Sequence, residues 1–131
     1  MLKEKSVQEL DVESLEHDEP SSFAHGEVRC AQCDQEISDT ASIFSLDGHS
    51  ARNAFANPAG YLRVVITFNA ARNYVEDLQQ TKDFTWFAGY SWKIIYCQQC
   101  KSHLGWKYRC NDGRTPNLFY GLLQSSITVD A

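Results

Sequence analysis

The decisive stretch of the chain runs from Phe84 to Tyr108 and reads FTWFAGYSWKIIYCQQCKSHLGWKY. It holds all three tryptophans of the sequence and one Cys-x-x-Cys pair within 25 residues. Packing alone tends to spread large aromatic side chains through a core, because each of them is heavily buried on average. Each tryptophan taken singly is better explained as a core residue, but their clustering indicates a site.

The five cysteines form two Cys-x-x-Cys pairs and one single residue: Cys30 with Cys33, Cys97 with Cys100, and Cys110. Two pairs of this spacing can surround one tetrahedral Zn²⁺ with four thiolates. Four cysteine ligands leave no coordination position for water, so we expect one structural zinc per chain. Because 63 residues separate the pairs, the metal would join two separate halves of the domain. His103 could compete as a ligand, but the fourth cysteine makes it redundant.

The hydrophobic pattern predicts a largely β domain with antiparallel strands. Residues 61–68 alternate apolar side chains on one face of an expected strand. A turn is predicted at Asn57–Gly60, and a hairpin turn at Asn111–Gly113 leads from one expected strand to the next. Residues 70–80 are polar and are predicted to form a long loop with at most one helical turn.

The charge is distributed unevenly along the chain. The first 27 residues carry eight acids against two lysines, a net charge of −6, and the remaining 104 residues sum to +1. This near-neutral part argues against a nucleic-acid partner, since such binders gather basic side chains on one face. The local basic group of Lys101, Lys107, Arg109 and Arg114 is better explained as a solvated strand face.

The acidic segment 1–24 is predicted to be a disordered tail that does not join the core. It lacks the apolar region of a secretory signal, and no window of the chain approaches the roughly 20 apolar residues that span a bilayer. We therefore expect a cytoplasmic protein without a membrane partner.

Several motifs resemble the thalidomide-binding domain of cereblon, known as the CULT domain. They are W-F-x-G-Y-x-W, C-x-x-C-x-x-H-L-G-W-K-Y and F-Y-G-L, with the earlier CAQC and NPAGY, and they cover about residues 25–127. The resemblance implies a mostly β, β-tent-like fold whose antiparallel sheets meet at the zinc site. It is closest to a stand-alone, bacterial-type member. The Lon-like and helical adaptor-binding regions of cereblon are absent, so a ubiquitin-ligase adaptor is not an expected partner.

The resemblance also implies the roles of individual residues. The zinc ligands of the family fall on Cys30, Cys33, Cys97 and Cys100, and its three-tryptophan cage falls on Trp86, Trp92 and Trp106. The complete implied ligand site is Asn57, Phe84, Thr85, Trp86, Trp92, Trp106 and Tyr108. Members of the family bind glutarimides such as the thalidomide ring, cyclic imides formed at protein C-termini, and uracil-like rings. Phe84 stands where eukaryotic members have a histidine.

Two other functions compete with this interpretation. Methionine sulfoxide reductase B has a related fold and a similar C-x-x-C-x-x-H-L-G motif, and Cys110 would have to be its nucleophile. Cys110 lies too early in the chain for that role, although Arg109 could lower the pKa of its thiol. A zinc-ribbon interaction or RNA-binding module would leave the tryptophan cluster unexplained. The sequence therefore favours a non-enzymatic binding domain for a cyclic imide or a modified protein C-terminus.

Overall fold

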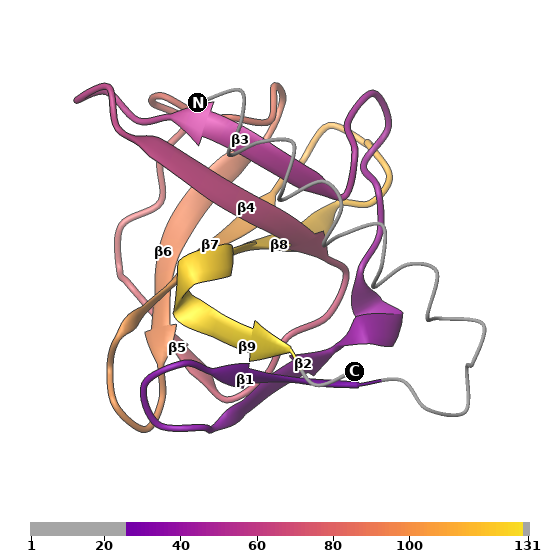
Figure 1. Cartoon of the computed structure of the whole chain (residues 1–131). Coiled ribbons are helices and arrows are strands. Elements are labelled where there is room, and N and C mark those ends of the chain that lie inside the picture. Colours follow the sequence, from indigo (N-terminus) through magenta and orange to yellow (C-terminus); the bar gives the residue numbers. More distant parts are fainter. Residues whose placement is uncertain (1–25, 130–131) are drawn as a thin grey trace.

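The structure is a computed structural model, and it describes residues 26–129. These residues form nine strands and two short 3-10 helices (Figure 1). In chain order the elements are β1 (Glu27–Cys30), β2 (Glu36–Asp39), η2 (Thr40–Ser42), β3 (Arg52–Ala56), β4 (Leu62–Phe68), β5 (Tyr74–Glu76), β6 (Ser91–Cys97), β7 (His103–Arg109), β8 (Leu118–Leu123), η3 (Gln124–Ser126) and β9 (Ile127–Val129). The predicted mostly β fold is confirmed. The predicted tail, 1–24, lies outside the described residues.

The strands form two antiparallel sheets. The small sheet has the order β2-β1-β9, and the large sheet has the order β3-β4-β8-β7-β6-β5. In Figure 1 the small sheet lies beneath the large one. The first apolar cluster contains side chains from both sheets: Val28, Cys30, Ile37, Ala51, Ile66, Phe68, Ile95, Cys97, Leu104, Tyr120, Leu122 and Ile127. This shared cluster is the core that holds the two sheets together.

A second apolar cluster contains side chains of the large sheet and of the segments beside it. Its buried members are Leu46, Phe87, Tyr90, Tyr108, Cys110 and Phe119. The alternation of β8 places Phe119 in this cluster and Tyr120 in the first one, so the two clusters lie on opposite faces of the strand. The last four residues of β4, 65–68, are all buried, as expected where both faces of a sheet are covered.

A β-bulge in β7 turns its side chains from one face to the other. His103 pairs with Tyr96 and Gly105 with Ile95, so Leu104 is an extra residue between them. Without the bulge, Leu104 and Trp106 would project from the same face. Instead Leu104 belongs to the first cluster, whereas Trp106 packs against the second one.

The predicted loop 70–80 is wrong in one part. Its residues 74–76 form β5, which pairs with β6 at the edge of the large sheet. The strand is only three residues long, which is too short for a clear alternation. Its side chains fix it instead: the hydroxyl groups of Tyr74 and Tyr120 lie 2.8 Å apart, and Lys107 donates to Glu76 at 2.6 Å. These long-range contacts could not be read from the local pattern.

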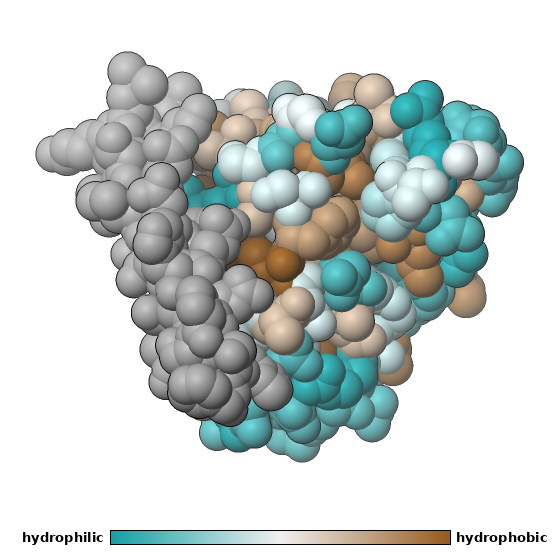
Figure 2. All heavy atoms as spheres, turned by 90° about the vertical axis from the view of Figure 1, so that its right-hand side faces the viewer, coloured by the Kyte–Doolittle hydropathy of each residue, from teal (hydrophilic) through white to brown (hydrophobic). Residues whose placement is uncertain are grey.

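The surface on the side shown in Figure 2 is mixed. Hydrophilic residues gather along its lower edge and at the upper right, and hydrophobic residues form patches between them. Such a mixture is ordinary for a folded domain. None of the helices in residues 26–129 has the length and apolar character needed to cross a bilayer.

The bulge generates the first testable prediction. A Cβ atom at Gly105 would lie 2.1 Å from the backbone oxygen of Gly121 on β8. Gly105→Ala is therefore expected to lower the free energy of unfolding by about 3 kcal/mol or more, as measured by urea denaturation. Gly113 is the matched control, because it also has a positive φ but has no atom within 4 Å of such a Cβ. Equal losses in the two variants would show that the close approach is unimportant.

Candidate functional site

The two Cys-x-x-Cys pairs meet between the two sheets. Cys30 ends β1 of the small sheet, and Cys97 ends β6 of the large sheet. Their sulfur atoms and those of Cys33 and Cys100 all lie within 4.8 Å of one another. The Cys30–Cys100 and Cys33–Cys97 sulfur distances are 3.6 and 3.5 Å. Four sulfurs at about 2.3 Å from a tetrahedral zinc lie about 3.8 Å apart, so the arrangement fits this metal.

Each Cys-x-x-Cys pair is held by a backbone turn of the same kind. The amide of Asp34 donates to the carbonyl of Cys30 at 2.9 Å, and the amide of Lys101 donates to that of Cys97 at the same distance. Asp34 and Lys101 both adopt a left-handed backbone, with φ of 70° and 66°. Two non-glycine residues in this region are uncommon, and their equivalence indicates that one geometry is required on both sides of the metal.

Ser102 supports two of the sulfur ligands. Its hydroxyl lies 3.4 Å from the sulfur of Cys30 and 3.2 Å from that of Cys100. This hydrogen bond lowers the pKa of Cys100 to about 6, which favours the thiolate that zinc binds. The donor set is therefore four sulfurs with a supporting hydroxyl, and it is closed to a fifth protein ligand from His103. The imidazole Nε2 of His103 instead donates to the carbonyl of Gly105 at 3.1 Å.

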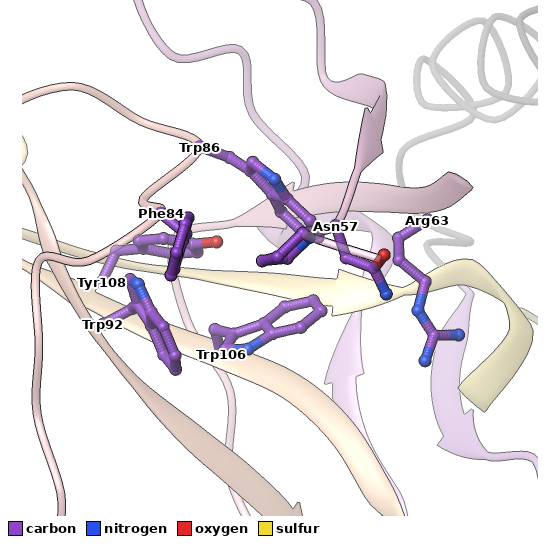
Figure 3. Close-up of a pocket in the computed structure, with 8 residues that line it drawn as sticks. Asn57, Arg63, Phe84, Trp86, Trp92, Trp106 and Tyr108 are labelled. Atoms are coloured by element: carbon purple, nitrogen blue, oxygen red, sulfur yellow. The ribbon is translucent and has the colours of Figure 1, made fainter. Parts of the chain in front are cut away.

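An aromatic cavity of about 190 Å³ lies on the face of β6 and β7 that carries the tryptophans. Figure 3 shows the tryptophan and tyrosine side chains around a common space. The cavity is lined by Asn57, Pro58, Arg63, Phe84, Trp86, Trp92, Trp106 and Tyr108. Trp92 and Trp106 come from neighbouring strands, whereas Trp86 comes from the segment that precedes β6.

Hydrogen bonds and ring contacts fix the tryptophan walls. The indole N–H of Trp86 donates to the carbonyl of Ala56 at 3.1 Å, and that of Trp92 donates to the carbonyl of Asp83 at 2.8 Å. Trp86 meets Trp106 edge to face, with ring centroids 5.0 Å apart and planes at 76°. Phe55 stacks on Trp86 at 4.9 Å. The walls are consequently held in place by the protein itself.

His103 and Tyr108 support the cavity from β7. The ring of His103 meets Trp106 edge to face at 5.0 Å, and burial lowers its pKa, so this imidazole is neutral near pH 7. Tyr108 is only 1% exposed, and burial raises the pKa of its hydroxyl. In Figure 3 this hydroxyl points toward the space between the tryptophans. It therefore offers a protonated oxygen at the floor of the cavity.

Asn57 lies at the start of the predicted turn between β3 and β4. The amide of Gly60 donates to its carbonyl at 2.8 Å, as a turn requires. The side-chain oxygen of Asn57 accepts hydrogen bonds from the amides of Ala59 and Tyr61, both at 3.0 Å. Among the described residues its NH₂ group has no partner, so this group can donate to a ligand.

Phe84 combines exposure with backbone strain. Its side chain is 73% exposed, and its φ is 57°, in the left-handed region. A bulky residue held there costs about 1–3 kcal/mol and persists only when its surroundings enforce it. The strained backbone places the phenyl ring at the edge of the cavity. Packing in the core does not explain this position, because the ring is largely exposed.

The structure brings six of the seven implied ligand residues to the cavity. Thr85 does not line it, because its hydroxyl donates to the carbonyl of Phe87 at 3.2 Å. Sequence reasoning missed Pro58 and Arg63, which do line it. Arg63 lies on β4 opposite Phe55, and this pairing, which brings it beside the tryptophans, gave no local signal in the sequence. Cys110 is buried in the second cluster and is not part of the cavity wall.

Comparison with known proteins gives the class of the chain. Residues 27–129 match the family model described as Yippee zinc-binding/DNA-binding/Mis18, centromere assembly. The chain belongs to this Yippee-Mis18 family. Together with the sulfur geometry, this membership identifies the four cysteines as the ligands of one structural zinc.

Within the family, the chain is similar to cereblon. It is 36% identical over 100 residues to the cereblon of Danio rerio, covering 75% of this chain and 23% of that protein. It is 30% identical over 103 residues to the cereblon of Drosophila willistoni, covering 76% of this chain and 17% of the relative. The chain thus spans about a fifth of the length of the curated relatives it matches. A cereblon-like family member is confirmed.

Removal of the metal is expected to unfold the domain. Structural zinc contributes apparent binding energies of roughly 10–16 kcal/mol, which is as large as the whole stability of a typical domain, about 5–15 kcal/mol. A chelator, or Cys97→Ser, should therefore abolish the β signal in circular dichroism and the cooperative melting transition. Cys110→Ser is the control, because it changes a cysteine outside the cluster and should retain one zinc per chain. An unchanged melting point after complete loss of zinc would contradict the structural role.

The backbone strain at Phe84 is expected to lower the stability of the protein, although it places the phenyl ring at the cavity. Phe84→Gly should raise the free energy of unfolding by about 1 kcal/mol, because glycine adopts the left-handed backbone without a steric cost. Little packing is lost, since the ring is largely exposed. Tyr61→Gly is the matched control: Tyr61 is 71% exposed but is not among the residues with positive φ. Urea denaturation of the two variants measures the free energy of unfolding. If it rises in both variants, or in neither, the backbone at Phe84 is not strained.

Proposed function

We propose that the aromatic cavity binds a small cyclic imide. Candidate ligands are a glutarimide ring of the thalidomide type, a cyclic imide at a modified protein C-terminus, and a uracil-like ring. One observation carries the proposal: all three tryptophans of the chain line one cavity, although they come from three different segments. The similarity to cereblon supports it, because the motifs that carry the tryptophans and the zinc cysteines resemble those of the thalidomide-binding domain.

The size of the cavity suits one ring. Pockets for drug-sized ligands have volumes of about 300–1,000 Å³, and this cavity has about 190 Å³. The edge-to-face contact of Trp86 and Trp106 forms a corner with two apolar walls. A compact, flat ring fills such a corner without the rotamer cost that a flexible chain would add.

The polar groups of the cavity suit the edge of an imide. An imide presents an acceptor, a donor and a second acceptor in a row. Asn57 can donate to a carbonyl oxygen through its NH₂ group, and the hydroxyl of Tyr108 can donate or accept. The resemblance to the thalidomide-binding domain implies that the backbone of residues 84–86 supplies further matching groups. A ring whose donors and acceptors do not match would leave polar groups unpaired between apolar walls, which makes the selection strong.

We propose a binding function without catalysis. The cavity lining contains no cysteine, and Cys110 packs with Tyr90 and Phe119 in the second cluster. The thiol of Cys110 lies 3.8 Å from the carbonyl of Arg114, which is a structural contact. Nothing in this arrangement favours a sulfoxide reductase over a binding domain.

The family description includes DNA binding, and we do not extend it to this chain. Residues 28–131 carry a net charge of only +1, and phosphate binding depends on clustered lysine and arginine. Several basic side chains are also engaged with acids: Lys93 and Lys107 with Glu76, Arg114 with Asp112, and Arg72 with Glu36. We propose a cereblon-like binding domain of the bacterial type.

Titration with glutarimide tests the proposal. A ring that enters the aromatic cavity should change the intrinsic fluorescence, because every tryptophan of the chain lines the cavity. Trp106→Ala should abolish this response and keep the zinc and the melting transition, since the lost side chain is only half-buried. N-methylglutarimide is the matched ligand control. It lacks the imide N–H, so a protein acceptor stays unpaired at a cost of about 1–3 kcal/mol, and it should not bind.

Two outcomes would contradict the proposal. If neither glutarimide nor uracil alters the fluorescence while Trp106→Ala unfolds the protein, the tryptophans are core residues. If N-methylglutarimide binds as tightly as glutarimide, the cavity recognises apolar shape and not the imide edge.

A further inference from the structure

A second hollow lies next to the aromatic cavity. Its volume is about 270 Å³, and it is lined by Asp77, Gln79, Thr81, Asp83, Phe84, Trp92 and Ile94. Phe84 and Trp92 also line the aromatic cavity, so the same two side chains form a common wall. The two hollows are therefore neighbours on the surface, separated by the side chains of Phe84 and Trp92.

The second hollow is built by a segment that pairs with β6 only at its two ends. The amide of Asp77 donates to the carbonyl of Ile94 at 2.8 Å. Thr81 and Trp92 exchange two backbone hydrogen bonds, at 2.8 and 3.1 Å. Between these points residues 78–80 arch away from the strand. The hollow therefore has an apolar floor from β6 and a rim from the arched segment.

The rim carries negative charge without a matching cation. Asp77 and Asp83 both line the hollow, and in the described part of the chain neither forms an ion pair. The nearby lysines of the sheet, Lys93 and Lys107, are both engaged with Glu76. Lys82 borders a different hollow, beside Gly89 and Arg109. One oxygen of Asp77 accepts a hydrogen bond from the amide of Leu78 at 2.7 Å, so a cationic group would find the other oxygen of Asp77 and the carboxylate of Asp83 here.

Apolar side chains accompany this charge. Leu78, on the arch itself, is 94% exposed, and Phe84 projects from its strained backbone between the two hollows. Phe84 and Trp92 line both hollows, and two residues of an extended chain span about 7 Å, so a short segment anchored in the aromatic cavity can pass these side chains into the second hollow. The surface suits a short extended peptide segment that carries a lysine or arginine. The aliphatic part of such a side chain would contact the apolar residues, and its charged end would reach the carboxylates.

We propose that the second hollow binds the polypeptide segment next to a C-terminal cyclic imide, and that Asp77 and Asp83 select for lysine or arginine within two residues of the imide. This inference rests on the proposed function of the aromatic cavity, because the ring anchors the segment. It assigns to the chain a sequence preference among modified C-termini.

Short synthetic peptides that end in a cyclic imide test the preference. Two peptides differ only in lysine or glutamate at the residue before the imide, and free glutarimide is the reference ligand. At low salt the lysine peptide is expected to bind about tenfold more tightly, and this ratio should shrink as salt screens the exposed carboxylates. The double variant Asp77→Asn/Asp83→Asn should reduce the ratio to less than about twofold and leave the affinity for glutarimide unchanged.

A control variant with the same change in net charge shows whether the lysine preference comes from the two carboxylates of the hollow or from the overall charge of the protein. Asp47→Asn/Asp112→Asn removes two acids that do not line the hollow, and the lysine preference should survive in it. Asp112 forms an ion pair with the exposed Arg114 and is not a member of the four-cysteine cluster. Fluorescence titration of all three proteins with all three ligands gives the complete comparison.

The outcomes distinguish this inference from the proposed function. Equal binding of the two peptides, with normal binding of glutarimide, overturns the role of the second hollow alone. A lysine preference that persists in Asp77→Asn/Asp83→Asn, or disappears in the control variant, overturns it as well. Failure of glutarimide and both peptides to bind overturns the proposed function itself.

Discussion

Four thiolates around one tetrahedral ion connect the two sheets of this molecule, and the rest of the structure depends on that connection. Cys30 and Cys33 belong to the β1–β2 hairpin of the small sheet, and Cys97 and Cys100 to the β6–β7 hairpin of the large one. The same hairpin carries Trp92 and Tyr108 as a cross-strand pair at its far end. The hairpin is therefore held by metal at one end and carries the walls of the cavity at the other. Small domains rarely obtain such rigidity from apolar burial alone.

Backbone irregularities convert this frame into a cavity. The bulge at Leu104 lets β7 contribute one side chain to the core between the sheets and the next large one, Trp106, to the opposite face. The left-handed backbone of Phe84 turns a phenyl ring outward beside the same face. Regular strands and relaxed loops would place these side chains elsewhere. Two departures from ideal geometry thus shape the place where a ligand is proposed to bind, as is common at functional sites.

The sequence predicted those features that follow from spacing or from resemblance. The Cys-x-x-Cys spacing was sufficient for the zinc site, and alternation was sufficient for the strand at 61–68. It was not sufficient for β5, whose three residues are fixed by partners on β6, β7 and β8. The bulge at Leu104 was also hidden, because an extra residue in a ladder becomes visible only once its partner strand is known. Arg63 escaped notice because its place beside the tryptophans depends on the β3–β4 pairing.

The anchoring of the indole groups has a consequence for protein engineering. Trp86 and Trp92 have already given their only hydrogen-bond donors to the carbonyls of Ala56 and Asp83. They can offer a guest molecule only flat apolar faces, which accept many rings equally well. Chemical discrimination is left to a few polar groups at the edge, such as Asn57. Substituting those polar residues while keeping the tryptophans would convert the same cavity into binding sites for different heterocycles. Tryptophan fluorescence would report ligand binding in each variant.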